Sequence, residues 1–549
     1  MNQFFMNEKQ QLVNEAIEGT LLSTPFHNLS RLALGNAMRV VVRSDWDRSK
    51  VALISGGGSG HEPAHIGFVG KGMLTAAVCG DVFASPSVDA VLHAIINVTG
   101  EAGCLLIVKN YTGDRLNFGL AAEKAKQLGY RVEMVMVRDD IALPDNPQPR
   151  GIAGTALVHK VAGYAAEQGQ SLAEVTALAQ RALEQTASIG VAFSSCHIPG
   201  EARDERVKPG SCELGMGIHG EPGASTLKTQ NSVELVTQLL QHLAPYAGQG
   251  KLALLINNLG GFSVLEMAVL TREVLRSSLG KQIQLLLGPA TLVSALDMKG
   301  FSLSVLQLDE ELEQALRADV EAAGWSVATS PATSLEEAPA TRLDQHKTVV
   351  PSANEDVAAQ LITLCQTLIT LESELNNLDA QVGDGDTGST FAAGARSLLQ
   401  ACESQTLPLD QTGLLFNVIG EKLASVMGGS SGVLMSIMFT AAGQRLEQGE
   451  SLPQALIYGL ERMQHYGGAR VGQRTMIDAL QPAFSALAAG KDLVAVAAAA
   501  REGADSTSRM RSAGAGRASY LNAESLDGVK DPGAYAVEKV FAALAEKQA

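Results

Sequence analysis

Three aspartates stand close together in the segment LDAQVGDGDTGST, from Leu378 to Thr390. Asp379, Asp384 and Asp386 are separated mostly by glycines and other small residues, so a short loop can fold back and bring the three carboxylates together. Carboxylates that converge repel one another unless a cation or several N–H groups lie among them. Mg²⁺ is usually held by a few carboxylates together with waters and substrate phosphates, so this segment is a candidate magnesium site.

A calcium-binding loop and a solvated acidic turn are the alternatives to a magnesium site. An EF-hand needs an acid or an amide at its fifth position and Glu at its twelfth. Counted from Asp384, these positions hold Gly388 and Ala395, which excludes the calcium loop. A solvated turn whose aspartates cap helices needs no metal, and the spacing alone leaves that alternative open.

Two turns in the same part of the chain have the composition of phosphate-binding loops. TGST at 387–390 and GGSSG at 428–432 each precede a helical segment. Helix N-termini bind phosphate through their free N–H groups and the helix dipole. Close packing of helices would also explain GGSSG taken alone. The two turns and the acidic cluster together favour a site for a nucleotide and Mg²⁺. The sequence contains neither a P-loop motif nor the glycine pattern of dinucleotide-binding folds, so the nucleotide fold is expected to be of another kind.

Histidine and charged residues accompany glycine-rich turns in the first half of the chain. His61 and His65 of GGGSGHEPAH have the spacing of a zinc-binding HExxH helix. Pro63 is unfavourable inside such a helix, which argues against a metalloprotease. In KNYTGD, Lys109 and Asp114 follow an apolar run and so lie at the carboxyl edge of a predicted strand, where open α/β sheets bind ligands.

His219 lies between glycines in the segment GMGIHGEPG at 215–223. Such glycines permit a strained backbone and the close approach of a ligand, which favours a functional histidine. A lone histidine in a loop is more often structural or merely exposed. Both interpretations of His219 stay open on this pattern alone.

The composition limits the class of protein. With 549 residues, 46% of them hydrophobic, the chain is long enough for several globular domains. A net charge of −16 disfavours a nucleic-acid binder, which needs clustered Lys and Arg. The six cysteines are dispersed, and we find neither a signal peptide nor a convincing membrane span. We therefore expect a reduced, cytoplasmic protein that binds neither nucleic acid nor membrane.

Two segments of different character must position these residues. Apolar runs alternate with helical stretches such as 154–186 in the first segment, as in α/β layers with buried strands. We predict an α/β domain over 1–330, a linker rich in Pro, Ser and Thr over 331–353, and an all-helical domain over 354–549. The apolar runs of the α/β domain are VALISGGG, GCLLIVKN, RVEMVMVRD, IGVAFSS, KLALLINN and QIQLLLG.

The helical domain is predicted to begin with one long amphipathic helix. Apolar residues recur at alternating spacings of four and three from Val357 to Leu378, which places one apolar stripe on a helix that ends at Asp379. Ser352 and Glu355 have the spacing of a capping box for its start.

The motifs together resemble those of the single-chain, ATP-dependent dihydroxyacetone kinase (glycerone kinase) family. GGGSGHEPAHIGFVGKGML, KNYTGDRLNFGLA and GMGIHGEPG are similar to its substrate domain. LDAQVGDGDTGSTF, MGGSSG, GQRTMIDAL and DPGA are similar to its nucleotide domain. The resemblance covers nearly the whole chain. It implies two α/β lobes, then a barrel of helices, and a homodimer in which the two domains meet across subunits.

The resemblance implies that the ketose is held covalently. The ring of His219 would attack the ketone of dihydroxyacetone and form a hemiaminal, which selects carbonyl compounds over glycerol and positions a small substrate. This step requires a neutral imidazole, so ketose binding is expected to weaken at acid pH. Asp114 would be the general base for the hydroxyl that attacks the γ-phosphate, with His61 assisting. The residues expected to hydrogen-bond the substrate hydroxyls are Gly58, Ser59, Gly60, His61, Lys109 and Asp114.

The resemblance also implies a nucleotide site in the helical domain. Asp379, Asp384 and Asp386 would bind two Mg²⁺ ions that bridge the phosphates of ATP, and the ions would neutralise the clustered carboxylates. The residues expected to cradle the phosphates are Thr387, Gly388, Ser389, Thr390, Ser430 and Ser431. Those expected around the adenosine are Met476, Arg517, Asp531, Pro532 and Gly533.

Three other functions are compatible with these motifs. The nearest is a kinase that takes its phosphate from a phosphocarrier protein, but relatives of that kind keep the two domains on separate chains. The second is an FAD-AMP lyase that cyclises FAD without needing His219. The third is a non-catalytic ketose sensor, although a pure sensor needs no aspartate triad. The main prediction is phosphorylation of dihydroxyacetone, and of glyceraldehyde, by ATP.

Overall fold

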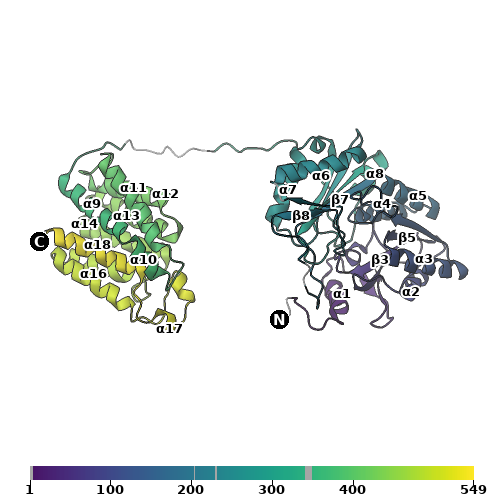
Figure 1. The fold of residues 1–549 in the computed structure, drawn as a ribbon, viewed down its shortest axis with the longest axis horizontal. Coiled ribbons are helices and arrows are strands. Elements are labelled where there is room, and N and C mark those ends of the chain that lie inside the picture. The colour runs from purple at the N-terminus through teal and green to yellow at the C-terminus, as the bar shows by residue number, and fades with distance from the viewer. Residues whose placement is uncertain (1–3, 203–204, 229–230, 341–348, 549) are drawn as a thin grey trace. The chain divides into compact units, whose positions relative to one another are not determined.

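The computed structural model describes residues 4–202, 205–228, 231–340 and 349–548. The chain divides into two compact units, Met1–Glu337 and Ala338–Ala549. The described elements of the first unit are two sheets with their helices, and those of the second unit are all helices (Figure 1). The predicted fold class, an α/β part followed by an all-helical part, is confirmed. Within the predicted linker, residues 341–348 lie outside the described residues.

Four adjacent strands of the first sheet run parallel, and several candidate site residues follow them. Strands β4, β3, β5 and β6 run parallel, while β2 and β1 add two antiparallel strands at one edge. In spatial order the strands are β1 (Leu29–Arg31), β2 (Arg39–Arg43), β4 (Ala76–Val82), β3 (Ala52–Ser59), β5 (Cys104–Lys109) and β6 (Val132–Val137).

Helices cover both faces of this sheet. Successive side chains of a strand point to opposite faces, and since the central strands are apolar on both faces, each face needs a cover. Ile54 and Leu106 join the apolar cluster that contains α2 and α3. Leu53 and Leu105 join the larger cluster on the other face, which contains α4 and α5. The helices of this unit's first half are α1 (Leu12–Ser23), α2 (Val88–Val98), α3 (Thr112–Gln127), α4 (Thr155–Glu167) and α5 (Leu172–Glu184).

The second sheet is mostly antiparallel. Of its described neighbours only β10 and β11 run parallel. Leu254 and Ile256 of β10 pack against α6 and α7, whereas Ala253 and Leu255 face the core shared with the first sheet. In spatial order the strands are β11 (Ile283–Ala290), β10 (Leu252–Asn258), β12 (Gly300–Gln307), β7 (Thr186–Ala192), β8 (Ser211–Leu214) and β9 (Ser225–Lys228). The helices here are α6 (Ser232–Ala247), α7 (Val264–Arg276) and α8 (Glu310–Arg317).

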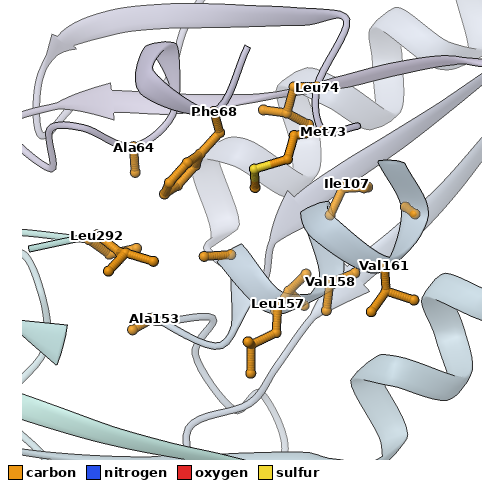
Figure 2. Packing of buried hydrophobic residues seen from close by; sticks show 14 of the residues in the cluster. Ala64, Phe68, Met73, Leu74, Ile107, Ala153, Leu157, Val158, Val161 and Leu292 are labelled. Carbon is orange, nitrogen blue, oxygen red and sulfur yellow. The ribbon is translucent and has the colours of Figure 1, made fainter. Parts of the chain in front are cut away.

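The core shared by the two sheets fixes the segments that carry the site. Figure 2 shows Phe68, from the 3₁₀ helix that follows β3, and Leu157 of α4 in this core, together with Leu292, which follows β11. Phe68, Leu157 and Leu292 are all fully buried. Burying a large apolar side chain stabilises a fold by about 1.5–3 kcal/mol, so these contacts hold the loops after β3 and β11 against α4.

The strand predictions were right but incomplete. All six predicted apolar runs lie on strands, namely β3, β5, β6, β7, β10 and β11. Strand β12 was missed because buried serines interrupt its apolar pattern, and the hydroxyl of Ser304 bonds that of Ser188 on β7 (2.6 Å). The helix predicted over 154–186 is two helices, since Gly169 (φ +74°) ends the first and Ser171 caps the second.

The helices of the second unit close into a barrel. Helix α9 packs against α11, the following helices pack in succession from α11 to α16, and α18 packs against both α16 and α9. The interior holds an apolar cavity of about 320 Å³. The helices are α9 (Glu355–Thr370), α10 (Glu372–Asp379), α11 (Thr387–Glu403), α12 (Thr412–Val426), α13 (Gly429–Glu447), α14 (Leu452–Gly467), α15 (Ile477–Ala488), α16 (Leu493–Thr507), α17 (Ala523–Leu526) and α18 (Pro532–Gln548).

Two details of the first predicted helix of this unit were wrong. The apolar stripe spans two helices, α9 and α10, which meet at Leu371. The capping residue is Asn354, whose side-chain oxygen accepts a hydrogen bond from the N–H of Val357 (3.1 Å). Ser352 cannot cap the helix because its hydroxyl pairs with Asp410 instead.

Two further features of the structure concern the cysteines and the lengths of the helices. All six cysteines are buried free thiols. Among the described residues, no helix has the length and apolar character needed to cross a bilayer.

Candidate active site

The carboxyl ends of β3 and β5 bring three ionisable side chains together. His61 follows β3, Lys109 is the last residue of β5, and Asp114 lies in the first turn of α3. Their exposed fractions are 0%, 1% and 5%. A Cβ on Gly57 would lie 3.6 Å from Oδ2 of Asp114 and 3.8 Å from Cε of Lys109. The structure therefore assembles these predicted residues at the sheet edge where ligands bind in open α/β folds.

Burial disfavours the charged forms of both Lys109 and Asp114, so it shifts their pKa values in opposite directions. Loss of water lowers the pKa of the Lys109 ammonium, and the carboxylate of Asp114 opposes that shift. Loss of water raises the pKa of the Asp114 carboxyl, and Lys109 opposes it. Oδ1 of Asp114 has no hydrogen-bond partner among the described residues. A carboxylate with a raised pKa and an open oxygen is suited to accept a proton from a substrate hydroxyl.

His61 is a neutral base with a defined tautomer. Its Nδ1 lies 2.7 Å from the carbonyl oxygen of Ser294, so Nδ1 carries the proton and donates it. The lone pair is then on Nε2, which finds no partner within the described part of the chain. Burial, with Lys109 and His219 nearby, lowers the pKa of His61 well below its usual range. At neutral pH, Nε2 of His61 is therefore unprotonated and can accept a hydrogen bond.

His219 reaches the same place from the second sheet, in the loop between β8 and β9. The centroid of its ring lies 4.7 Å from that of Tyr111, 4.9 Å from that of His61 and 5.2 Å from that of Phe83. Its Nδ1 lies 3.0 Å from Oε1 of Glu221. Because 21% of the His219 side chain is exposed, a small molecule can reach the ring.

The backbone of the His219 loop is anchored on both sides of the histidine. Arg150 donates to the carbonyl oxygen of Gly215 (2.6 Å) and to the carboxylate of Asp140 (2.9 Å). Arg206 donates to the carbonyl oxygen of Gly220 (2.9 Å). Charge-assisted hydrogen bonds of this kind hold a glycine-rich loop in one conformation.

Gly58 and Ser59 are the last two residues of β3, and Gly60 follows them. The hydroxyl of Ser59 donates to the carbonyl oxygen of Gly80 (2.9 Å), and the N–H of Gly60 donates to Glu62 (2.9 Å). Both donors already have protein partners, so their part in binding the substrate hydroxyls stays a prediction.

Asp379, Asp384 and Asp386 converge in the helical unit. One carboxylate oxygen from each lies within 4.8 Å of the others. Asp379 is buried at the end of α10, and its Oδ2 accepts hydrogen bonds from three backbone N–H groups. The donors are Gly385, Asp386 and Thr387, at 3.0, 3.0 and 3.1 Å. Asp379 therefore shapes the loop, and the three carboxylates have the hard oxygen ligands that a divalent cation needs.

The two predicted phosphate turns begin helices α11 and α13. In neither helix does the N-cap residue itself, Asp386 or Gly428, bond the first turn through a side chain. At α11 the N–H of Thr387 donates to Asp379, and the N–H of Ser389 donates to Oδ1 of Asn376 (3.0 Å). The start of α13, with Ser430 and Ser431 in its first turn, is therefore the more open of the two to an anion.

The residues expected around the adenosine lie at three helix starts. Met476 precedes α15, and Pro532 begins α18. A Cβ on Gly533 would lie 3.1 Å from the Cβ of Met476, so these two segments are neighbours. Asp531 is partly buried, and loss of water raises its pKa to about 6. Arg517 begins the 3₁₀ helix η3 (Arg517–Tyr520), and its side chain lies outside the described residues.

Known proteins share this architecture along the whole chain. A model of the Dak1 domain matches residues 26–324, and one of the DAK2 domain matches residues 381–546. The chain is 58% identical to dihydroxyacetone kinase from Citrobacter freundii, over 100% of both chains. It belongs to the dihydroxyacetone kinase family.

A second relative and a solved structure also match the chain over nearly its whole length. The chain is 39% identical to triokinase/FMN cyclase from Mus musculus, over 98% of each chain. A crystal structure of the dihydroxyacetone kinase from C. freundii in complex with AMP-PNP and Mg²⁺ matches with a TM-score of 0.85, at 56% identity over 100% of both chains. The predicted family is thus confirmed.

Five residues at or near the two candidate sites were not predicted from the sequence. Tyr111 and Glu221 stand inside the quoted motifs, where their types gave the only available signal. Phe83, which packs on His219, and Asn376, which bonds Ser389, have no local signal in the sequence. Arg474 is only 1% exposed and donates to a backbone carbonyl, whereas a charged side chain in a loop is ordinarily expected in water.

Buried histidines should make the first unit acid-sensitive. His61, His65 and His159 are all buried, and Nδ1 of His65 lies 3.2 Å from Nε2 of His159. Burial lowers their pKa in the folded chain, to about 3 for His159, against about 6.5 in an unfolded chain. Between these values the unfolded chain binds protons that the folded chain does not. The free energy of unfolding therefore falls as the pH drops below about 6.5.

The variant His159→Leu tests this expectation. It removes one titrating group, so the loss of stability between about pH 6.5 and about pH 4 should become shallower by up to about 1.4 kcal/mol per pH unit. Urea unfolding followed by tryptophan fluorescence measures it, because Trp46 and Trp325 both lie in the first unit. The exposed His242, replaced by Gln, is the control. An unchanged slope in His159→Leu would contradict a neutral buried imidazole.

Proposed function

We propose that the chain phosphorylates dihydroxyacetone with ATP as the donor. The observation that carries this proposal is the presence, in one chain, of a buried histidine–lysine–aspartate site and a convergent aspartate triad. A relative that is 58% identical over its full length is a dihydroxyacetone kinase, which supports the same reaction here. Glyceraldehyde is a second proposed substrate, in line with the triokinase activity named for the mouse relative.

The first unit would bind and activate the ketose. Nε2 of His219 would attack the carbonyl carbon and form a hemiaminal, which turns a freely diffusing triose into a fixed acceptor. Lys109, whose ammonium is buried, would donate hydrogen bonds to a substrate hydroxyl. Asp114 would take the proton of the hydroxyl that attacks the γ-phosphate, and its raised pKa and open Oδ1 support that role. Nε2 of His61 would be a second acceptor.

The second unit would bind the nucleotide. The three aspartates fit Mg²⁺, because their oxygens converge and are hard donors, and two ions are proposed. Bound Mg²⁺ neutralises negative charge on the phosphates during transfer. The N–H groups at the starts of α11 and α13 would hold phosphate oxygens, through Thr387 to Thr390 and through Ser430 and Ser431. Met476, Arg517 and the turn 531–533 would surround the adenosine.

The finer predictions belong to the same proposal. We infer a homodimer in the cytoplasm from the family resemblance. FAD cyclisation is a second candidate activity, because the mouse relative carries FMN cyclase in its name and is 39% identical. It would use the nucleotide site alone.

The kinase assay is the direct test. Purified full-length protein with dihydroxyacetone, ATP and Mg²⁺ should form dihydroxyacetone phosphate, measured with a coupled reductase, and glycerol should give no product. Asp384→Ala should lower kcat by at least about a hundredfold. The variant loses one proposed ligand of Mg²⁺, and the ion would otherwise offset the negative charge of the phosphates. Asp356→Ala, at an exposed position on α9, is the matched control and should keep full activity. Absence of product would refute the kinase and direct attention to FAD cyclisation.

His219→Ala separates the two sites. The variant cannot form the hemiaminal, so KM for dihydroxyacetone should rise at least about tenfold, equivalent to about 1.4 kcal/mol, while ATP binding measured by calorimetry stays unchanged. His242→Ala on the surface of the same unit is the control. An unchanged KM for dihydroxyacetone in His219→Ala would remove the covalent role.

A further inference from the structure

The carboxylate of Glu221 makes two hydrogen bonds to the same residue. Oε1 lies 3.0 Å from Nδ1 of the His219 ring, and Oε2 accepts from the backbone N–H of His219 at 3.0 Å. The N–H of Gly217 donates to the carbonyl oxygen of Glu221 (3.0 Å) and closes the turn. One carboxylate therefore holds both the ring and the backbone of His219.

The chain is shaped around this carboxylate. A Cβ on Gly217 would lie 1.8 Å from Oε2 of Glu221, so only glycine leaves room for it. Arg150, the nearest guanidinium of the loop, bonds Asp140 and the carbonyl oxygen of Gly215. Among the described residues, the ion-pair partner of Glu221 is His219. An acidic side chain placed this way is directed at the imidazole.

The contact decides which ring nitrogen carries the proton. Burial would raise the pKa of the Glu221 carboxyl, but the hydrogen bond and charge of His219 lower it to about 2, so the group is ionised and can only accept. Nδ1 of His219 must then carry the proton, and the lone pair is on Nε2. The ring contacts of Tyr111 and Phe83 restrict its rotation. Nε2 is the nitrogen left for bond formation.

We propose that Glu221 is the positioning residue of the ketose site, which holds His219 in its Nε2-nucleophilic tautomer and supplies the counter-charge to the ring. This inference rests on the proposed function. The Nε2 lone pair forms the bond to the carbonyl carbon, the π pair of the carbonyl moves to its oxygen, and that oxygen takes a proton from solvent. The ring gains one positive charge, which Glu221 offsets at 3.0 Å.

The counter-charge determines how long the adduct lasts. An imidazolium without a partner is a good leaving group and would return the ketone, so Glu221 favours the bound form. Other charged and titratable groups also act on this part of the site, namely Lys109, Asp114, His61, Arg150 and Asp140. Among the described residues, Glu221 is the carboxylate that hydrogen-bonds the His219 ring itself.

The test compares Glu221→Gln with Glu221→Asp in the full-length enzyme. Gln keeps the shape and removes the charge, so kcat/KM for dihydroxyacetone should fall about tenfold to hundredfold with KM for ATP unchanged. The acid limb of the kcat/KM profile should move to lower pH, because the cationic ring loses its counter-charge. Asp should recover part of the activity and return the limb towards its original position. Glu201→Gln, at an exposed site, is the matched control.

A second measurement reads the tautomer directly. NMR of ¹⁵N-histidine-labelled protein should show His219 protonated at Nδ1 in the unchanged chain and a mixture of tautomers in Glu221→Gln. Two results would overturn the inference: full kcat/KM in Glu221→Gln, or equal losses in the Gln and Asp variants with the acid limb in place. An unmutated chain without kinase activity would instead refute the proposed function, so the two failures are distinguishable.

Discussion

The loss of water around Lys109, Asp114 and His61 is the constraint on which the proposed ketose site depends. Burial pushes each group towards its neutral form, and none of them can move into solvent, because the core shared by the two sheets and α4 fixes the ends of β3 and β5. Burial raises the pKa of the Asp114 carboxyl and lowers the pKa values of Lys109 and His61. The same three residues in water would keep their ordinary pKa values.

In the helical unit the dominant electrostatic effect is repulsion among three converging carboxylates. Asp384 and Asp386 remain exposed, and the buried Asp379 positions the loop through three backbone N–H groups. Their mutual repulsion is relieved when a cation binds, so the site is organised by charge and not by desolvation. We interpret the two units as an acceptor site that works by excluding water and a donor site that works by concentrating charge.

Local patterns predicted what depends on local sequence. The aspartate spacing predicted a convergent triad, and six apolar runs predicted six buried strands. The sequence could not show that Asn354 outcompetes Ser352 as a helix cap, because Asp410, which engages Ser352, is distant along the chain. Nor could it show that Glu221 faces His219, since an acid in a glycine-rich loop is ordinarily solvated. These missing features depend on contacts that only the folded chain creates.

Covalent attachment of the ketose to His219 can be tested by NMR of dihydroxyacetone ¹³C-labelled at its carbonyl carbon, bound to the full-length chain without nucleotide. We expect the bound label to give the signal of a tetrahedral carbon attached to nitrogen, and this signal to be absent in His219→Ala. A bound label that keeps its ketone signal, in protein with normal kinase turnover, would rule out the covalent adduct.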